Sequence, residues 1–299
     1  MGRTGLQISA LGIGGWHLGF APTQEESNRI VREAMDAGVN FFDNAWDYHA
    51  GGGEERMGMA LQGVRHQAIL MTKACTHGRG KDVAMRQLED SLRRLKTDYL
   101  DVWQIHEVIY WNEPEAIFAP GGVIEAIDQA KRQGKVRFVG VTGHKHPEIH
   151  LAVLAHDYPF DTIQMPLNCM DTHFHSFEQR VLPEAAKRGI AVLGMKSLGG
   201  GGEIVKSGFA KAADALRYAM SLPVATTISG IDSLDVLRQN LAVARGFQPM
   251  NEAEMEALRD RTKAVASDGR YELYKTSIAY DGPEARRQHG FPPAAEVPA

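Results

Sequence analysis

Four side chains that can hold or transfer a proton follow three neighbouring apolar runs of this chain. Asp43 and Tyr48 follow the first run, Lys73 closes the second, and His106 follows the third. A lysine buried at the end of an apolar run needs a carboxylate partner, and Asp43 is the natural one. An adjacent ammonium stabilises a phenolate, so Lys73 is expected to lower the pKa of the Tyr48 hydroxyl and make it a proton donor near neutral pH. His106 would orient a carbonyl oxygen or help to deliver the proton.

Each of these residues also has a structural explanation when it is taken alone. Asp43 is of a type that caps turns, Tyr48 of a type that packs loops, and His106 is compatible with a hydrogen-bonded core histidine. A structural ion pair would explain Lys73. The four positions together, at the ends of three adjacent runs, favour a catalytic site.

The elements that must position these groups alternate along the chain. Short apolar, β-branched runs predict strands, and stretches with one apolar face predict helices. The predicted strands are Leu11–Ile13, Asn40–Phe42, Ile69–Thr72, Tyr99–Ile105, Val136–Thr142, Thr162–Met165, Ala191–Met195 and Val224–Ile228. The clearest predicted helices are Gln24–Ala37, Lys81–Leu95, Gly122–Gln133, Phe177–Arg188, Ala210–Met220 and Leu234–Ala244. Gly38, Gly134 and Gly189 each follow a periodic run where a helix commonly ends.

Eight strands that alternate with helices must pair in parallel, and eight such units favour a closed (β/α)8 TIM barrel over an open sheet. The glycines of Gly12–Gly15 do not form the GxGxxG pattern of dinucleotide-binding sheets. We expect one barrel domain over residues 1–299, in which a C-terminal helix (Glu252–Ala266) and an extended tail, together residues 251–299, pack on the barrel. The tail is expected to reach either the barrel mouth or a neighbouring subunit. In such barrels the site lies at the carboxyl ends of the strands, where all four candidate residues fall.

The composition of the 299-residue chain narrows its classes of partner. A formal net charge of −4 argues against a nucleic-acid or anionic-membrane partner, and no apolar run is long enough for a membrane helix. Cys75 and Cys169 are the only cysteines and make neither a disulfide framework nor a zinc cluster, so a reducing cytoplasm is the expected location. The histidines at 144, 146, 173 and 175 lack the further ligands of a metal site, and no metal is expected.

Several segments of the chain resemble the aldo-keto reductase family. They are Phe41–Tyr48 (FFDNAWDY), Gly53–Gly58 (GEERMG), Met71–Lys73 (MTK), Leu95–His106 (LKTDYLDVWQIH), Gly134–Thr142 (GKVRFVGVT) and Asp161–Gln164 (DTIQ). The resemblance extends from Gly2 to about Ala244, and its motifs are specific in combination. It implies NAD(P)H bound in an extended form at the barrel mouth, with Tyr48 as general acid. Asp43 and Lys73 would tune that tyrosine, and His106 would position the carbonyl.

The resemblance also implies which residues hold the cofactor. They are Gly15, Trp16, Thr142, Gly143, Gln164, Met195, Lys196, Leu198, Gly200, Ser229, Gly230, Gln239 and Asn240. Thr142-Gly143 stands where the family usually has Ser-Asn, and Met195 stands where it has an aromatic residue that stacks on the nicotinamide. His144 either replaces the missing amide or lies in a surface loop.

The choice between NADPH and NADH depends on the segment after the eighth strand. NADPH-preferring relatives hold the 2′-phosphate with a Lys and an Arg, and these positions are Gly230 and Val236 here. Asp232 and Asp235 add negative charge nearby, which Arg238 would offset in part. Phosphate recognition depends on charge-assisted hydrogen bonds, so we expect NADH to be accepted at least as well as NADPH.

Large side chains are expected to line the substrate side of the site. The candidates are Trp16, His17, Trp46, Trp111 and Met170, while Cys75 is expected to be an inert structural thiol. Such a wall suits an apolar or aromatic carbonyl compound, or a sugar. The predicted function is the NAD(P)H-dependent reduction of an aldehyde or ketone to an alcohol, or the reverse reaction. The alternative is a nicotinamide-binding regulatory or low-turnover subunit of the same fold.

Overall fold

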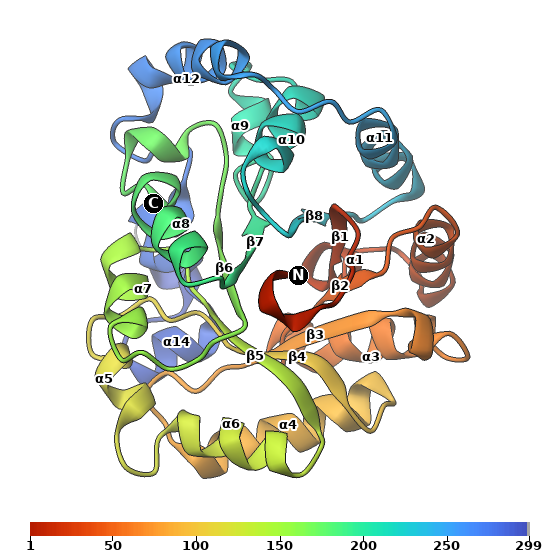
Figure 1. The fold of residues 1–299 in the computed structure, drawn as a ribbon, viewed down its shortest axis with the longest axis vertical. Coiled ribbons are helices and arrows are strands. Elements are labelled where there is room, and N and C mark those ends of the chain that lie inside the picture. Colours follow the sequence, from red (N-terminus) through yellow and green to blue (C-terminus); the bar gives the residue numbers. More distant parts are fainter. Residues whose placement is uncertain (298–299) are drawn as a thin grey trace.

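Eight parallel strands close into a barrel in the order β1 to β8 (Figure 1). In the computed structural model, which describes residues 1–297, they are β1 Leu11–Gly14, β2 Phe41–Asp43, β3 Ile69–Ala74, β4 Leu100–Ile105, β5 Val136–Thr142, β6 Thr162–Pro166, β7 Ala191–Met195 and β8 Thr226–Gly230. The barrel closes where β1 pairs with β8, with Leu11 opposite Thr227. The predicted (β/α)8 fold is confirmed.

A ring of helices surrounds the barrel, one after each strand (Figure 1). These helices are α2 Gln24–Asp36, α3 Gly52–Ala60, α4 Lys81–Leu95, α6 Val123–Arg132, α7 Pro147–Leu154, α8 Phe177–Lys187, α10 Ala212–Ser221 and α11 Leu234–Arg245. Short helices α1 Gly15–Leu18, α5 Glu113–Phe118 and α9 Glu203–Lys206 lie in the loops after β1, β4 and β7. The boundaries of the predicted elements lie within two residues of those observed. Helices α3 and α7 were not predicted, since α3 contains three glycines, which disfavour helix, and α7 has only eight residues.

Side chains inside the barrel fill it below the mouth. Phe41, Met71, Val102, Leu193 and Ile228 form this inner cluster, and a larger core lies between the strands and the helices. Successive side chains of a strand point to opposite faces, so residues two apart share a face. The positions two residues after Phe41 and Met71 therefore also point into the barrel, at its carboxyl end.

The chain after the ring forms helix α12, Glu252–Ala266, followed by a segment that we call the tail, residues 267–297. The tail is partly helical, with α13 Leu273–Thr276 and α14 Pro283–Gln288. Blue in Figure 1, it contacts the loops that lead into α5 and α8. The tail thus lies at the mouth of its own barrel. No helix among the described residues is long and apolar enough to cross a membrane.

Candidate active site

Asp43 and Lys73 occupy the two inward positions that follow Phe41 and Met71. The ammonium of Lys73 forms an ion pair with the Asp43 carboxylate and donates a second hydrogen bond, 2.6 Å long, to the carbonyl oxygen of Asn44. Both side chains are buried. The carboxylate partner expected for this lysine is therefore present.

Tyr48 and His106 lie beside this pair. The centre of the Tyr48 ring is 5.0 Å from the Lys73 ammonium nitrogen and 5.5 Å from the centre of the His106 ring. Tyr48 begins a short turn in which His49 and Ala50 both have positive φ angles, a local geometry that sequence periodicity does not reveal. The structure thus brings together all four predicted catalytic residues, which we call the tetrad: Asp43, Tyr48, Lys73 and His106.

The environment of Tyr48 differs from the expectation in one respect. Desolvation raises the pKa of its hydroxyl well above the ordinary value, and the negative charges of Asp43, Asp47 and Glu107 add to this rise. The ammonium of Lys73 was expected to lower this pKa, but its charge is shared with the Asp43 carboxylate to which it is paired. Tyr48 is therefore a neutral phenol at physiological pH, able to donate a proton to a much stronger base.

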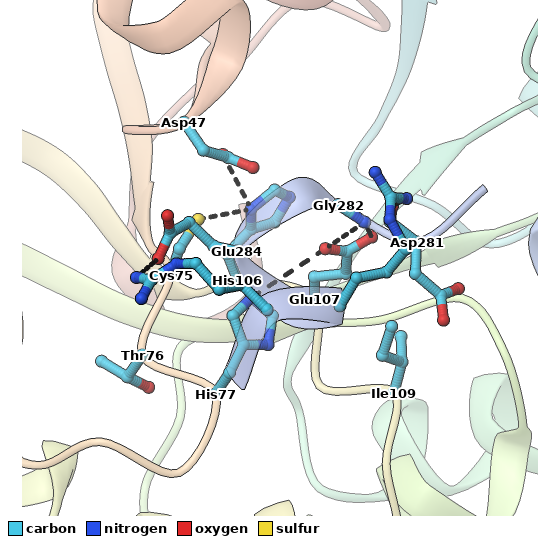
Figure 2. A network of polar contacts seen from close by, with 12 residues as sticks. Asp47, Cys75, Thr76, His77, His106, Glu107, Ile109, Asp281, Gly282 and Glu284 are labelled. Atoms are coloured by element: carbon cyan, nitrogen blue, oxygen red, sulfur yellow. Dashed lines mark hydrogen bonds and ion pairs between the residues drawn. The ribbon is translucent and has the colours of Figure 1, made fainter. Parts of the chain in front are cut away.

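His106 has two polar neighbours on one side of its ring (Figure 2). Its Nδ1 atom lies 3.1 Å from the Cys75 sulfur and 3.3 Å from a carboxylate oxygen of Asp47. Burial raises the pKa of the Cys75 thiol well above its usual value, so Cys75 is a neutral thiol within the site. Cys75, which was expected to be an inert structural thiol, thus lies next to His106, whereas Asp47 was not singled out at all. Its position directly before Tyr48 was the available signal.

Two predicted cofactor residues lie next to the tetrad on β5 and β6. Thr142 and Gln164 are register partners, and the Gln164 side-chain amide donates a 3.2 Å hydrogen bond to Asp43. The Gln164 oxygen Oε1 is buried and has no hydrogen-bond partner among residues 1–297. A carboxamide N–H of a nicotinamide would satisfy this acceptor.

The neighbouring Gly143 has no room for a side chain. A Cβ atom at this position would lie 2.2 Å from the carbonyl oxygen of Val108 and 2.8 Å from the His150 ring. His144 is buried, with one ring nitrogen 2.8 Å from the Tyr274 carbonyl and the other 3.0 Å from Glu107. The expectation that His144 lies in a surface loop is therefore wrong.

Gly143→Ala should consequently lower the free energy of unfolding by about 1–3 kcal/mol, the usual cost of overpacking. Urea denaturation measures this difference. Gly52→Ala is the matched control, because a Cβ atom there makes only an ordinary contact of 3.7 Å. An equal effect of the two substitutions would show that the loop after β5 yields to a side chain.

Predicted cofactor residues after β7 lie beneath the tail. Lys196 has a left-handed backbone with φ 56°, and its ammonium lies 4.7 Å from the centre of the Tyr280 ring. Gly200 also has a positive φ, and a Cβ atom there would lie 2.2 Å from the Tyr280 hydroxyl. Met195 and Leu198, in the same segment, are partly buried. The tail therefore forms one wall of this part of the mouth.

The residues predicted to hold the adenosine end lie at β8 and α11. Buried Asn240 donates a 2.9 Å hydrogen bond to the Ser229 hydroxyl, whereas Gln239 is exposed. Arg238 pairs in bidentate fashion with Glu33 at 2.7 and 2.9 Å, so its charge is already neutralised. Arg238, which was expected to offset the charges of Asp232 and Asp235, is therefore paired with Glu33 instead.

Gly15 and Gly230 have polar side chains packed against them. A Cβ atom on Gly15 would lie 2.5 Å from the Asn44 amide, and one on Gly230 would lie 2.2 Å from His17 Nδ1. His17 was predicted to line the substrate pocket. It lies beside Gly230 and Gly200.

Of the five predicted pocket residues, Trp16 is the one whose ring packs against Tyr48. Trp16 lies edge-on to Tyr48 with ring centres 5.4 Å apart, and 43% of its surface is exposed. Trp46 turns away, because its indole N–H is 3.3 Å from Asp90 of α4. Met170 is fully buried in the core, and Trp111 is 64% exposed beside His146. The prediction that Met170 lines the pocket is therefore wrong, whereas those for His17 and Trp46 stay predictions.

Glu107, the residue after His106, connects the site to the tail (Figure 2). Its two carboxylate oxygens accept hydrogen bonds from the Gly282 N–H at 2.9 and 3.0 Å, and it also contacts His144. Glu107 and Gly282 are 175 positions apart in the sequence. No local pattern indicates this contact.

These features define a class of protein: a (β/α)8 barrel with a buried lysine–aspartate pair beneath a tyrosine and a histidine at the mouth. The model of the Aldo/keto reductase family matches residues 10–207 of this chain. The chain belongs to this family.

Individual relatives agree with this placement. L-galactose dehydrogenase of Arabidopsis thaliana is 35% identical over 154 residues, which cover 48% of this chain and about half, 47%, of the plant protein. The 6-dehydroglucose reductase of Novosphingobium aromaticivorans is 30% identical over 67% of this chain and 68% of that protein. A solved aldo-keto reductase from Klebsiella pneumoniae in complex with NADPH has the same fold, with a TM-score of 0.72, 24% identity, and coverage of 86% of this chain and 92% of that one.

Proposed function

We propose that the protein is an NAD(P)-dependent oxidoreductase that interconverts a carbonyl compound and an alcohol. The observation that carries this proposal is the buried Lys73–Asp43 pair beneath Tyr48 and beside His106. Family membership supports the reaction class, and the unpartnered Gln164 oxygen supports a nicotinamide.

In the proposed reaction a dihydronicotinamide held beside Thr142 and Gln164 would supply a hydride to the carbonyl carbon. His106 and Tyr48 hold the carbonyl oxygen, and the phenolic proton of Tyr48 moves to that oxygen as it becomes an alkoxide. Burial raises the pKa of the Tyr48 hydroxyl, which keeps the proton on Tyr48 until negative charge develops on the substrate oxygen. Lys73 places its ammonium 5.0 Å from the centre of the ring on which the phenolate forms.

The proposed cofactor is NADH at least as readily as NADPH. Gly230 and Val236 offer no cation to a 2′-phosphate, and Arg238 is already paired with Glu33. We expect kcat/KM for NADH to equal or exceed that for NADPH in steady-state assays. Val236→Arg should raise the NADPH value selectively. A strong preference of the wild-type enzyme for NADPH would contradict the assignment of this segment.

A polyhydroxylated carbonyl compound is the proposed substrate class. Trp16 presents a partly exposed indole beside Tyr48, and such a surface stacks against the apolar face of a sugar. Two relatives are named for sugar substrates, L-galactose dehydrogenase and 6-dehydroglucose reductase.

The test is to titrate the protein with each nucleotide by tryptophan fluorescence, and then to follow nucleotide absorbance with a panel of sugar and simple carbonyls. Binding together with turnover supports the proposal. Tight binding without turnover of any carbonyl favours the regulatory alternative.

A further inference from the structure

The Asp47 carboxylate lies against the ring of His106 and near the thiol of Cys75. Its side chain is 11% exposed, and its oxygen Oδ1 is shielded from solvent and has no standard hydrogen bond among the described residues. The imidazole Nδ1 of His106, 3.3 Å away, is at the long end of hydrogen-bond distance. Such contacts often tighten when a substrate binds.

The electrostatics of the cluster agree with this pairing. Burial alone would raise the pKa of Asp47, but the neighbouring His106, Cys75 and His77 outweigh it and hold that pKa well below its usual value. Asp47 is therefore an anion at neutral pH. A buried anion without a partner is costly, so its place beside His106 indicates a pairing.

We infer that Asp47 is a positioning residue for His106 in the proposed reaction. Its carboxylate faces Nδ1 and accepts the Nδ1–H of the imidazolium, the form in which Nε2, on the opposite side of the ring, also carries a proton and can donate a hydrogen bond to the substrate oxygen. That cation in turn stabilises negative charge on the oxygen while Tyr48 supplies the transferred proton.

The arrangement follows from the local sequence. Asp47 directly precedes Tyr48, so one turn after β2 presents both the proton donor and the residue that orients its neighbour. Cys75 approaches the same nitrogen from the end of β3, and its neutral thiol limits the direction in which the ring can turn. Figure 2 shows both side chains on the same side of the imidazole.

The kinetic test compares Asp47→Asn with Asp157→Asn, a control at a side chain that is 85% exposed. We expect Asp47→Asn to lower kcat about 10- to 100-fold, the usual effect of losing a group that orients a histidine, with little change in nucleotide affinity. In a His106→Gln background the same substitution should cause no further loss, because Asp47 acts through His106. Equal losses in both backgrounds would overturn the proposal.

A second measurement does not depend on the proposed function. Nitrogen-15 NMR of the His106 ring reports which nitrogens carry protons, and Asp47→Asn should change that pattern whereas Asp157→Asn should not. If the pattern is unchanged, the pairing is wrong. If the pattern changes in a protein that turns over no carbonyl, Asp47 does contact His106, but neither residue has the proposed catalytic role. A stoichiometric metal ion bound by wild-type protein and lost in Asp47→Asn would also overturn the proposal, since these three side chains are potential ligands.

Discussion

Replacing Tyr48 by phenylalanine should lower kcat by about 10²- to 10⁴-fold, the usual cost of losing a general acid. The substitution removes one hydroxyl and keeps the ring that packs against Trp16 and His106. Affinity for the nucleotide should therefore change little. Steady-state kinetics gives the rate, and fluorescence titration gives the dissociation constant.

Tyr99→Phe is the matched control for this experiment. Tyr99 directly precedes β4, at the end of the barrel opposite the mouth, and its ring packs against Arg65. Removing the Tyr99 hydroxyl, at that end of the barrel, should leave kcat unchanged. If Tyr48→Phe retained most of the wild-type rate, Tyr48 would not be the acid, and a role for the fold in nucleotide binding alone would gain support.

Asp43 and Lys73 were predictable because their positions follow from strand periodicity, whereas the turn that begins at Tyr48 is not periodic. Once a run is assigned to a strand and one residue to the barrel interior, the residue two positions on must face inward as well. This rule places Asp43 after Phe41 and Lys73 after Met71, and the barrel rule then places both at the mouth. Neither step requires knowledge of a distant part of the chain.

The walls of the site were not predictable in this way, because loop backbones set them. Trp46 lies only two residues before Tyr48, yet its side chain turns toward Asp90 of α4. His17 follows Trp16 directly but lies beside Gly230. Side-chain type alone indicates a large or polar group in a loop, whereas its direction depends on backbone angles that no periodic pattern encodes.

The tail shows the same limit at long range. Glu107 meets Gly282, and Asp171 meets Lys275, across more than a hundred residues in each case. The sequence of the tail contains aromatic residues, glycines and prolines without periodicity. It therefore did not decide whether the tail reaches the barrel mouth or a neighbouring subunit. Glu107 and Asp171 hold the tail at the barrel mouth, but this can be seen only when the tail and the barrel loops are both placed in space.

Lys275→Met should lower the free energy of unfolding by about 3–5 kcal/mol, because it breaks a buried ion pair from one side only. The ammonium has no exposed surface and donates hydrogen bonds to Asp171 and to the Phe174 carbonyl, both at 2.7 Å. Glu272 lies 3.0 Å away, and burial already raises its pKa. Without the lysine, two carboxylates would remain buried together without a cation, and one would have to bind a proton or move into solvent.

Urea denaturation measures the loss, and Lys263→Met, at an exposed position of α12, is the control. Adding Asp171→Asn to Lys275→Met should recover part of the stability, since it removes one of the two buried carboxylate charges left without a cation.

Limited proteolysis of Lys275→Met should cut within the tail first. Because the tail also supplies the Gly282 N–H to Glu107, next to His106, its release should lower kcat as well. A variant that unfolds like wild type would mean that the ion pair contributes nothing net, and that the remaining contacts of the tail, through Glu107 and Glu113, are sufficient to hold it at the barrel mouth.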